Sequence, residues 1–431
     1  MNFLHRVLLK APSASCSHKL LLRTSARASS KSSQNDPPPA RESQSDSASS
    51  STSSSNIDAF SIMRGKFSPD FAKKAMLKKE SLTSILRPKT SKIELTPDSG
   101  EEKTKPKRFL VGRDFLSLKH FGKDEIHQFL WTAKDLKTRI KDNGEVLQPL
   151  TGKTAALVFE KDDTASRLNA ELGLARLGGQ AAYFNASDLH LDGKENWKDS
   201  ARLLAGAADL IIVGAGKQEV LEEVANESTV PVVTGMSDLL QPLQVLAYFV
   251  TLQEYFGYLR GLKIAWIGDG NSVLNSLLYG CARLGIDLNT ATPVGYEPDT
   301  DVMLDAMKIS GQTGASFLIG NDPLQAVYRA DAIIADSWTK PGADDENIKK
   351  RIKDFAGFGV NRKMMKEAGG EWVFLHSLPR RPHEVTDDIY YGQESLVWRA
   401  AENRLWITMA VMLHLFQPYS PTTPKPKYVR G

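Results

Sequence analysis

Short apolar runs alternate with longer amphipathic segments from about residue 114 to residue 416. The apolar runs have the length of buried strands and are rich in Val, Ile, Leu and Ala, which is typical of strands in parallel sheets. We predict strands at Thr154–Phe159, Ala181–Phe184, Leu210–Val213, Val230–Val233, Lys263–Ile267, Leu288–Ala291, Ser316–Ile319, Ala332–Ala335 and Trp372–Leu375.

Apolar residues at helical spacing fill many of the intervals between these strands. We predict helices at Ser166–Leu177, Gln218–Asn226, Leu243–Tyr258 and Ser272–Leu284, and a closing helix over about Ala400–Phe416. Strands that alternate with helices indicate parallel sheets covered by helices on both faces. Because there are too many strands for one sheet, we expect two doubly wound α/β domains that divide near residues 255–262.

The first 35 residues have a different composition. They carry six basic side chains and no acidic one. Arg and Lys recur among leucines, which is typical of a mitochondrial presequence, whereas Arg6 and Lys10 interrupt the apolar run that a secretory signal would need. We therefore expect import into the mitochondrial matrix, with cleavage near residues 25–35.

Residues 36–111 separate this segment from the α/β region. Residues 36–56 are rich in Ser and Pro and are expected to form a disordered linker. Nine basic residues lie between Arg64 and Lys92 against two acids, Asp70 and Glu80, and a helix is predicted over about Pro69–Leu86. This basic arm, residues 57–108, is either a solvated extension or a docking element for an acidic protein, RNA or an anionic membrane surface.

Composition and charge exclude several classes of protein. The formal net charge is +4, and the six basic residues of the presequence exceed it, so the rest of the chain is net negative. No apolar run reaches the ~18–20 residues that a membrane-spanning helix needs. Two cysteines, Cys16 and Cys281, are too few for a disulfide scaffold or a cysteine-cluster metal site.

One turn has the spacing of a weak dinucleotide-binding signal. Gly268-Asp269-Gly270 follows the predicted strand Lys263–Ile267, but Val273 stands at the third glycine position. Asp269 would also repel a pyrophosphate, although it could instead cap the following helix. We therefore expect no nicotinamide cofactor, and no other cofactor or metal.

Ligands of doubly wound folds bind beyond the carboxyl ends of the strands, and the loops found there are the most specific parts of this sequence. Phe159-Glu160-Lys161 with Thr164 and Arg167-Leu168 resembles the first ligand loop of the transcarbamylases. Further segments are similar to the ornithine carbamoyltransferases in particular: Trp266–Asn271, Gly295–Pro298, Asn321-Asp322-Pro323, His376 with Leu378-Pro379-Arg380, and Ala401–Arg404. The resemblance covers residues 112–420 in order.

This resemblance implies two α/β domains, a trimer, and a site between the domains that transfers a carbamoyl group from carbamoyl phosphate to the δ-amine of ornithine. It assigns residues 112–254 to a carbamoyl-phosphate-type domain and residues 255–399 to an ornithine-type domain. Residues 400–420 would form a C-terminal helix that returns to the first domain. Such a reaction depends on positioning and electrostatics, with arginines on the phosphate and a deprotonated amine held in line.

The phosphate side of the implied site has lost positive charge. The family reads Ser-Thr-Arg-Thr-Arg after a basic residue, whereas this chain has Asp163-Thr164-Ala165-Ser166-Arg167 after Asp162. Ala165 and Gly214 replace two phosphate-binding arginines, and Gln241 replaces a carbamoyl-binding histidine. Gln244 and Arg404 are kept, and Arg167 is expected to be structural.

The amino-acid side is altered less. Asn271 and Asp336 match family positions, and Asp336 would hold the ornithine amine. The replaced positions are Ser272 for an asparagine, Lys340-Pro341-Gly342 for the mobile Ser-Met-Gly loop, and Ser377, ahead of Leu378, for a cysteine. A lysine at position 340 would repel a cationic substrate.

These substitutions predict a catalytically inactive member of the family that acts as a structural or interaction module, with small-molecule binding doubtful. Three alternatives stay open. The chain could be an ornithine carbamoyltransferase whose phosphate contacts come from other groups or a neighbouring subunit. It could bind a less anionic ligand, or its arm could join a larger mitochondrial RNA–protein assembly.

Overall fold

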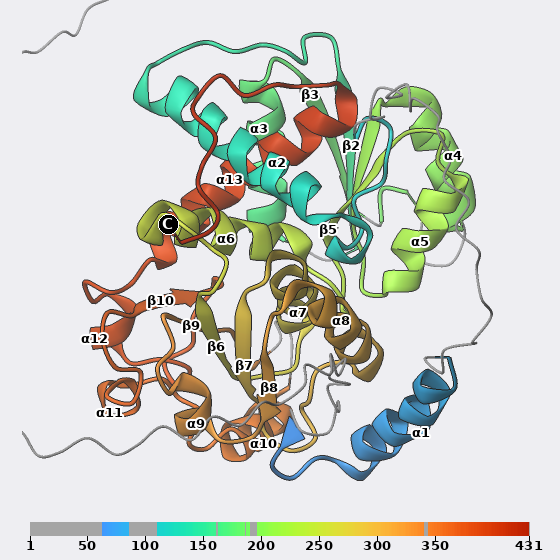
Figure 1. The fold of residues 1–431 in the computed structure, drawn as a ribbon. Coiled ribbons are helices and arrows are strands. Elements are labelled where there is room, and N and C mark those ends of the chain that lie inside the picture. Colours follow the sequence, from blue (N-terminus) through green and yellow to red (C-terminus); the bar gives the residue numbers. More distant parts are fainter. Residues whose placement is uncertain are drawn as a thin grey trace, which may run out of the picture. The chain divides into compact units, whose positions relative to one another are not determined.

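The computed structural model describes residues 63–85, 110–160, 163–185, 187–189, 196–339 and 344–430, with the backbone alone for residues 79–85. The predicted presequence and linker lie outside these residues. So do Lys161, Asp162 and Lys340, and residues 57–62 and 86–108 of the basic arm. The predicted α/β class is confirmed, because the described residues form two parallel sheets flanked by helices (Figure 1).

The first sheet has four parallel strands in the order β3-β2-β4-β5. Its strands are β2 (Thr154–Phe159), β3 (Gln180–Asn185), β4 (Leu210–Gly214) and β5 (Val232–Met236). The predicted strand at Val230–Val233 begins two residues too early. Pro231 has no N–H to donate to the ladder, so the pairing of β5 with β4 starts with Val232 opposite Ile211.

The second sheet has six parallel strands in the order β1-β8-β7-β6-β9-β10. They are β1 (Met63–Arg64), β6 (Lys263–Ile267), β7 (Asp287–Ala291), β8 (Phe317–Gly320), β9 (Ala332–Ala335) and β10 (Val373–His376). Strand β6 is central and almost fully buried, as its uninterrupted apolar sequence predicts. Strand β1 was not predicted, since two residues carry no detectable period.

Helices cover both sheets and cross between them. They are α1 (Pro69–Ile85), α2 (Lys123–Leu136), α3 (Thr164–Arg176), α4 (Trp197–Ala207), α5 (Gln218–Glu227), α6 (Pro242–Phe256), α7 (Ser272–Leu284), α8 (Thr300–Thr313), α9 (Pro323–Val327), α10 (Asp345–Asp354), α11 (Arg362–Met365), α12 (Asp387–Tyr390) and α13 (Val397–Phe416), with a 3₁₀ turn at Leu118–His120 and a π-helical turn at Lys137–Asp142. No helix in the described ranges is long and apolar enough to cross a membrane.

Helices α6 and α13 join the two halves of the body. Residues 242–253 of α6 and 406–415 of α13 are buried on every side, which is why these stretches are mostly apolar all round rather than on one stripe. Helix α13 packs against α6, α2 and α3, and α6 also packs against α7. Gly257, in the left-handed region at φ 80°, ends α6 and lets the chain turn toward β6.

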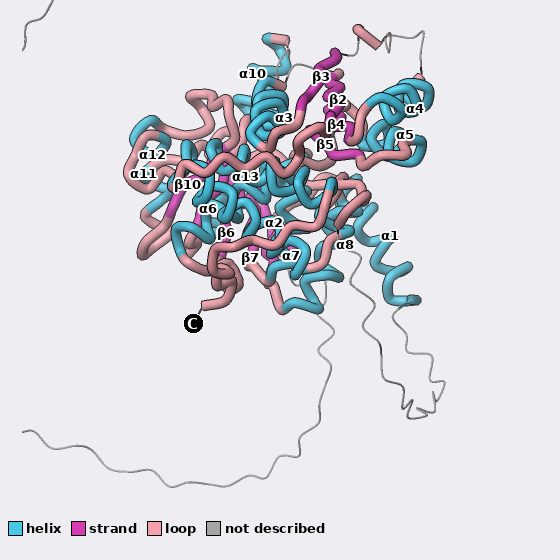
Figure 2. The backbone as a smooth tube through the Cα atoms, turned by 90° about the horizontal axis from the view of Figure 1, so that it is seen from above, coloured by secondary structure: helices cyan, strands magenta, loops and turns pink. Residues whose placement is uncertain are grey.

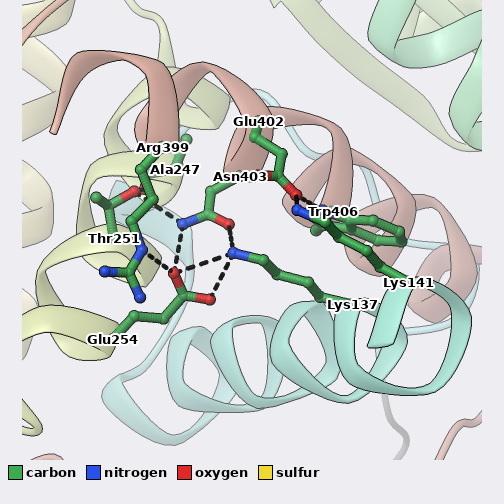
Figure 3. Close-up of polar contacts among 9 residues, drawn as sticks. All are labelled: Lys137, Lys141, Ala247, Thr251, Glu254, Arg399, Glu402, Asn403 and Trp406. Atoms are coloured by element: carbon green, nitrogen blue, oxygen red, sulfur yellow. Dashed lines mark hydrogen bonds and ion pairs between the residues drawn. The ribbon is translucent and has the colours of Figure 1, made fainter. Parts of the chain in front are cut away.

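A buried polar cluster fixes these crossing helices (Figure 3). The Glu254 carboxylate on α6 accepts hydrogen bonds from Lys137 Nζ at 2.9 Å, Arg399 Nε at 2.9 Å and Asn403 Nδ2 at 3.0 Å. Asn403 also donates to Thr251 Oγ1 at 2.9 Å and accepts from Lys137 at 2.8 Å. One carboxylate therefore links three segments that are far apart in the sequence.

Replacing Glu254 by Ala is expected to lower the free energy of unfolding by about 3–5 kcal/mol, because it leaves the largely buried Lys137 without its counter-charge and removes one acceptor of Asn403. Chemical denaturation measures this decrease. The control is Glu402→Ala in the neighbouring Lys141–Glu402 pair, whose side chains are 50% and 35% exposed. Exposed pairs contribute only about 0–1 kcal/mol. Equal decreases in the two variants would contradict the assigned role of Glu254.

The C-terminal tail, residues 417–430, lies along α2. Asp135 accepts from the Tyr419 hydroxyl at 2.6 Å and from the Thr423 amide at 2.8 Å. The Tyr428 ring stacks on His127 with centroids 3.8 Å apart. Nearby on α13, His414 Nε2 lies 2.7 Å from Thr132 Oγ1 inside the core.

These two histidines make stability depend on pH. Burial lowers the pKa of His127 and of His414 from 6.5 to about 4. The unfolded chain therefore binds more protons than the folded chain between pH ~4 and ~6.5, so stability falls as the pH is lowered through that window. We expect denaturation midpoints to show this slope and His127→Phe/His414→Phe to reduce it, while the lowered pKa of His120 keeps part of it. Above pH ~7 the imidazoles of His127 and His414 are neutral in both the folded and the unfolded chain, so there the two substitutions should change stability by a constant amount.

Candidate functional site

In the first ligand loop, between β2 and α3, the polar side chains hydrogen-bond to groups of the loop itself. Asp163 caps α3 by accepting from the Ser166 amide at 3.0 Å, and its second carboxylate oxygen accepts from the Ser166 hydroxyl. Ala165, where the resemblance places an arginine, adds neither charge nor hydrogen bond. Thr164 is exposed. The predicted positions are thus brought together, but around an acidic side chain.

Arg404, the retained arginine of the phosphate side, also turns to this loop. Its Nη2 donates to Ser166 Oγ at 2.6 Å and lies 3.9 Å from Asp163 Oδ2. The Arg404 and Asp163 side chains are 12% and 17% exposed. Nε of Arg404 is buried and has no hydrogen-bond partner among the described residues. The guanidinium therefore faces a carboxylate of its own chain.

Gly214 ends β4 beneath the Phe159 ring. A Cβ placed on Gly214 would lie 2.3 Å from Phe159 Cδ1, and one on Gly235 would lie 2.8 Å from Cε1 of the same ring. Phe159 thus occupies the space into which a side chain at 214 would extend. An arginine at this position requires the ring to move.

Gln241 and Gln244 stand at the start of α6. The Gln241 amide donates to Ser276 Oγ on α7 at 2.7 Å, which ties α6 to the first helix that follows β6. Gln244 is buried. Both predicted residues therefore lie at the junction of the two halves.

Tyr248, one turn further along α6, was missed in the sequence. It is fully buried. Burial raises the pKa of its phenol, and the charge of Asp336 adds to this rise. Ser377, Gln244 and Arg404 lower this pKa, so residues of both the phosphate and the amino-acid side act on the phenol, whose hydroxyl has no hydrogen-bond partner among the described residues. The signal that could have found it is its position four residues after Gln244, on the same face of the helix.

The amino-acid side is held by Asp336 at the end of β9. Its Oδ2 accepts from Asn271 Nδ2 at 2.6 Å, and its Oδ1 accepts from the Ser337 amide at 2.8 Å and from the Ser377 hydroxyl. Asn271 also caps α7 through the Val273 amide at 3.0 Å. The carboxylate expected to hold an amine is thus satisfied by its own chain.

The remaining predicted positions of the amino-acid side are Ser272, Leu378 and Lys340. Ser272 is buried in the first turn of α7, and Leu378 is 46% exposed. Lys340 lies outside the described residues.

The prediction that Asp269 caps a helix is wrong. The cap of α7 is Asn271, and Asp269 Oδ2 instead accepts a hydrogen bond from Arg351 Nη1 on α10 at 2.8 Å.

Glu384 is a second buried residue that the sequence did not reveal. Its Oε1 accepts from Ser337 Oγ at 2.8 Å and from the Trp338 amide at 3.0 Å. Its Oε2 accepts from the Arg381 amide at 2.6 Å and lies 3.4 Å from His376 Nε2. Glu384 therefore ties the loop after β9 to the loop after β10. The sequence did not predict this role, because Glu384 follows Arg380–His383 at a spacing that matches no motif.

Arg167 contacts residues of its own chain. Its guanidinium stacks over the Tyr183 ring, 3.7 Å from the centroid, and Nε pairs with Glu171 at 3.0 Å. In the described part of the chain, no group of three or more His, Cys, Asp or Glu residues could hold a metal ion.

Two family models match this chain. The "Aspartate/ornithine carbamoyltransferase, carbamoyl-P binding domain" model matches residues 113–254, and the "Aspartate/ornithine carbamoyltransferase, Asp/Orn binding domain" model matches residues 260–415. Together they cover more than half of the chain. The basic arm lies outside both.

Individual relatives agree with these matches. The mitochondrial ornithine carbamoyltransferase of Aquarana catesbeiana is 44% identical over 319 residues, which are 74% of this chain and 91% of the relative. The mitochondrial ornithine transcarbamylase of Gallus gallus is 43% identical, with 74% of this chain and 90% of the relative covered. The structure of ornithine carbamoyltransferase from Pyrococcus furiosus, 39% identical, superposes with a TM-score of 0.69 over 72% of this chain and 98% of its own.

Proposed function

Because this chain belongs to the aspartate/ornithine carbamoyltransferase family, we propose that it keeps the carbamoyltransferase body and has lost carbamoyl transfer, so that it serves as a structural or interaction module. One observation carries this proposal. The retained Arg404 bonds to Ser166 and faces Asp163 in the loop where carbamoyl phosphate would be bound. The protein's own carboxylate thus takes the place of the substrate's phosphate.

The energetics favour loss of phosphate binding. Ala165 and Gly214 remove two charge-assisted hydrogen-bonding groups worth about 1.5–3 kcal/mol each, which together weaken affinity by roughly two to four orders of magnitude. Asp163 adds a negative charge close to where the phosphate dianion would lie.

The amino-acid side supports the same proposal. Asp336 has three donors from its own chain, Asn271, Ser337 and Ser377, and an incoming ammonium group would have to displace some of them. Tyr248 is buried among the groups of both sides. The carboxylate that would hold the ornithine amine is therefore engaged by groups of its own chain.

Turnover decides between this proposal and an active ornithine carbamoyltransferase. We expect the full chain to form no citrulline from carbamoyl phosphate and ornithine. Robust citrulline formation would overturn the proposal.

Two further properties belong to the proposal. We expect the trimer of the family to persist, with the exposed Leu168 and Leu172 on the outer face of α3 as contact residues. Analytical ultracentrifugation measures the molar mass.

We also expect the chain to be imported into the mitochondrial matrix, because residues 1–35 have the composition of a presequence and two of the relatives are mitochondrial. A fluorescent fusion of the full chain tests the destination.

A further inference from the structure

The described part of the basic arm, residues 63–85, lies against the second sheet. Strand β1 pairs in parallel with β8, with Met63 opposite Ile319 and Arg64 opposite Gly320. Helix α1 then packs beside α8, as the two views show (Figure 1 and Figure 2). This segment precedes residue 113, where the match to the family begins.

Apolar residues of the arm enter the core. Phe71 and Ala75, four residues apart, share one face of α1, and Phe67 just ahead of the helix packs against the same core. Phe71 and Ala75 are 6% and 1% exposed, and the Phe67 and Phe71 rings stack with centroids 5.3 Å apart. The arm is thus bound by the same kind of packing that holds the body together.

Charges strengthen the contact between α1 and α8. Lys74 Nζ lies 3.6 Å from Asp301 and 4.0 Å from Asp299, and Lys78 also pairs with Asp301. The hydrogen bond from Lys78 lowers the pKa of Asp301. These two acids, with Asp305, line a cavity of about 980 Å³, so the arm supplies positive charge to an acidic rim.

A continuous set of contacts leads from the arm to the amino-acid side of the cleft. The Ser68 amide and hydroxyl donate to the Glu297 carboxylate at 2.6 and 3.0 Å. The Glu297 backbone packs so closely on Gly270 that an added Cβ would lie 2.2 Å from its carbonyl carbon. The Gly270 amide donates to Tyr296 O at 2.8 Å. The next residue is Asn271, which holds Asp336.

We propose that residues 63–78 form an intramolecular clasp that holds the loop of residues 293–298 on the turn of residues 268–271. The clasp thereby fixes the amino-acid side of the cleft in one arrangement. In this clasp Lys74 and Lys78 pair with acidic side chains of the same chain. This role does not depend on whether the site is active.

Hydrogen exchange of the full chain tests the clasp. In Phe71→Asp, the buried charge is expected to release the arm and to raise exchange at least tenfold in residues 268–274 and 293–301. The exposed Lys73 is one helical position from Lys74, and Lys73→Glu is expected to leave both segments at wild-type rates. A released arm with unchanged exchange in residues 268–274 would overturn the proposal.

A charge exchange separates specific pairing from a general loss of packing. Lys74→Gln/Lys78→Glu should raise exchange in residues 293–301, and addition of Asp301→Lys, which then faces no lysine at position 74, should restore protection. Failure of Asp301→Lys to restore it would overturn the ionic part of the clasp. RNA binding by the wild type that Lys78→Glu abolishes while exchange stays unchanged would assign the arm to RNA instead.

Discussion

Purified full-length protein is expected to show no citrulline formation above the uncatalysed background when given carbamoyl phosphate and ornithine. Transition-state stabilisation in this chemistry comes from positive charge around the leaving phosphate. This chain has Ala165 and Gly214 in place of two arginines, and its remaining Arg404 is turned to Ser166 and Asp163. The absence of each charge-assisted hydrogen bond to the phosphate lowers the rate by roughly ten- to a hundredfold.

The sharpest comparison restores the phosphate loop within the same chain. Asp162→Arg/Asp163→Ser/Ala165→Arg rebuilds the loop, and a second version adds Gly214→Arg. The two versions are needed because Phe159 fills the space beside Gly214. The Pyrococcus furiosus enzyme serves as the positive control, and thermal unfolding shows that each variant is folded. Turnover by the unmodified chain comparable to that control would refute the loss of activity.

Replacing Asp163 by Ala is expected to destabilise the protein and to create a phosphate-dependent melting temperature. Removal of the α3 cap costs about 0.5–2 kcal/mol, and Arg404 no longer has the carboxylate that it faces. Inorganic phosphate can then take the vacated position. At tenfold excess over its dissociation constant, it would restore about 1.4 kcal/mol. Differential scanning calorimetry with and without phosphate measures both effects.

Asp163→Asn is the matched control, because asparagine also caps helices but carries no charge. It should keep most of the cap energy and still acquire phosphate sensitivity. The wild type should melt at the same temperature with or without phosphate. If neither variant responds to phosphate even when Ala165→Arg is added, the carboxylate does not stand in for that anion.

The fold was predictable because buried parallel strands are continuous apolar runs. The predicted Thr154–Phe159 and Lys263–Ile267 strands have the observed bounds, since nothing competes with burial there. Strand β5 was displaced by Pro231, a local effect that a hydropathy pattern does not register. Strand β1 depends on its partner β8 rather than on its own two residues.

The candidate site was only half predictable. Motif matching located Asp163, Asn271 and Asp336, because these positions follow strands. It could not show that Arg404 turns to Ser166, or that Asn271 rather than Asp269 caps α7, because such contacts depend on side-chain geometry. Tyr248 and Glu384 were missed for the same reason, since their partners lie far away in the sequence.

The pairing of β1 with β8 also bears on how the protein behaves in solution. Strand β8 would otherwise stand at the margin of its sheet, with unpaired backbone groups that can template a strand from another molecule. Met63 and Arg64 occupy that margin, and the charged, exposed Arg64 discourages further strand addition. Proteolytic removal of the arm would therefore do more than take away a flanking helix: it would uncover a surface prone to self-association.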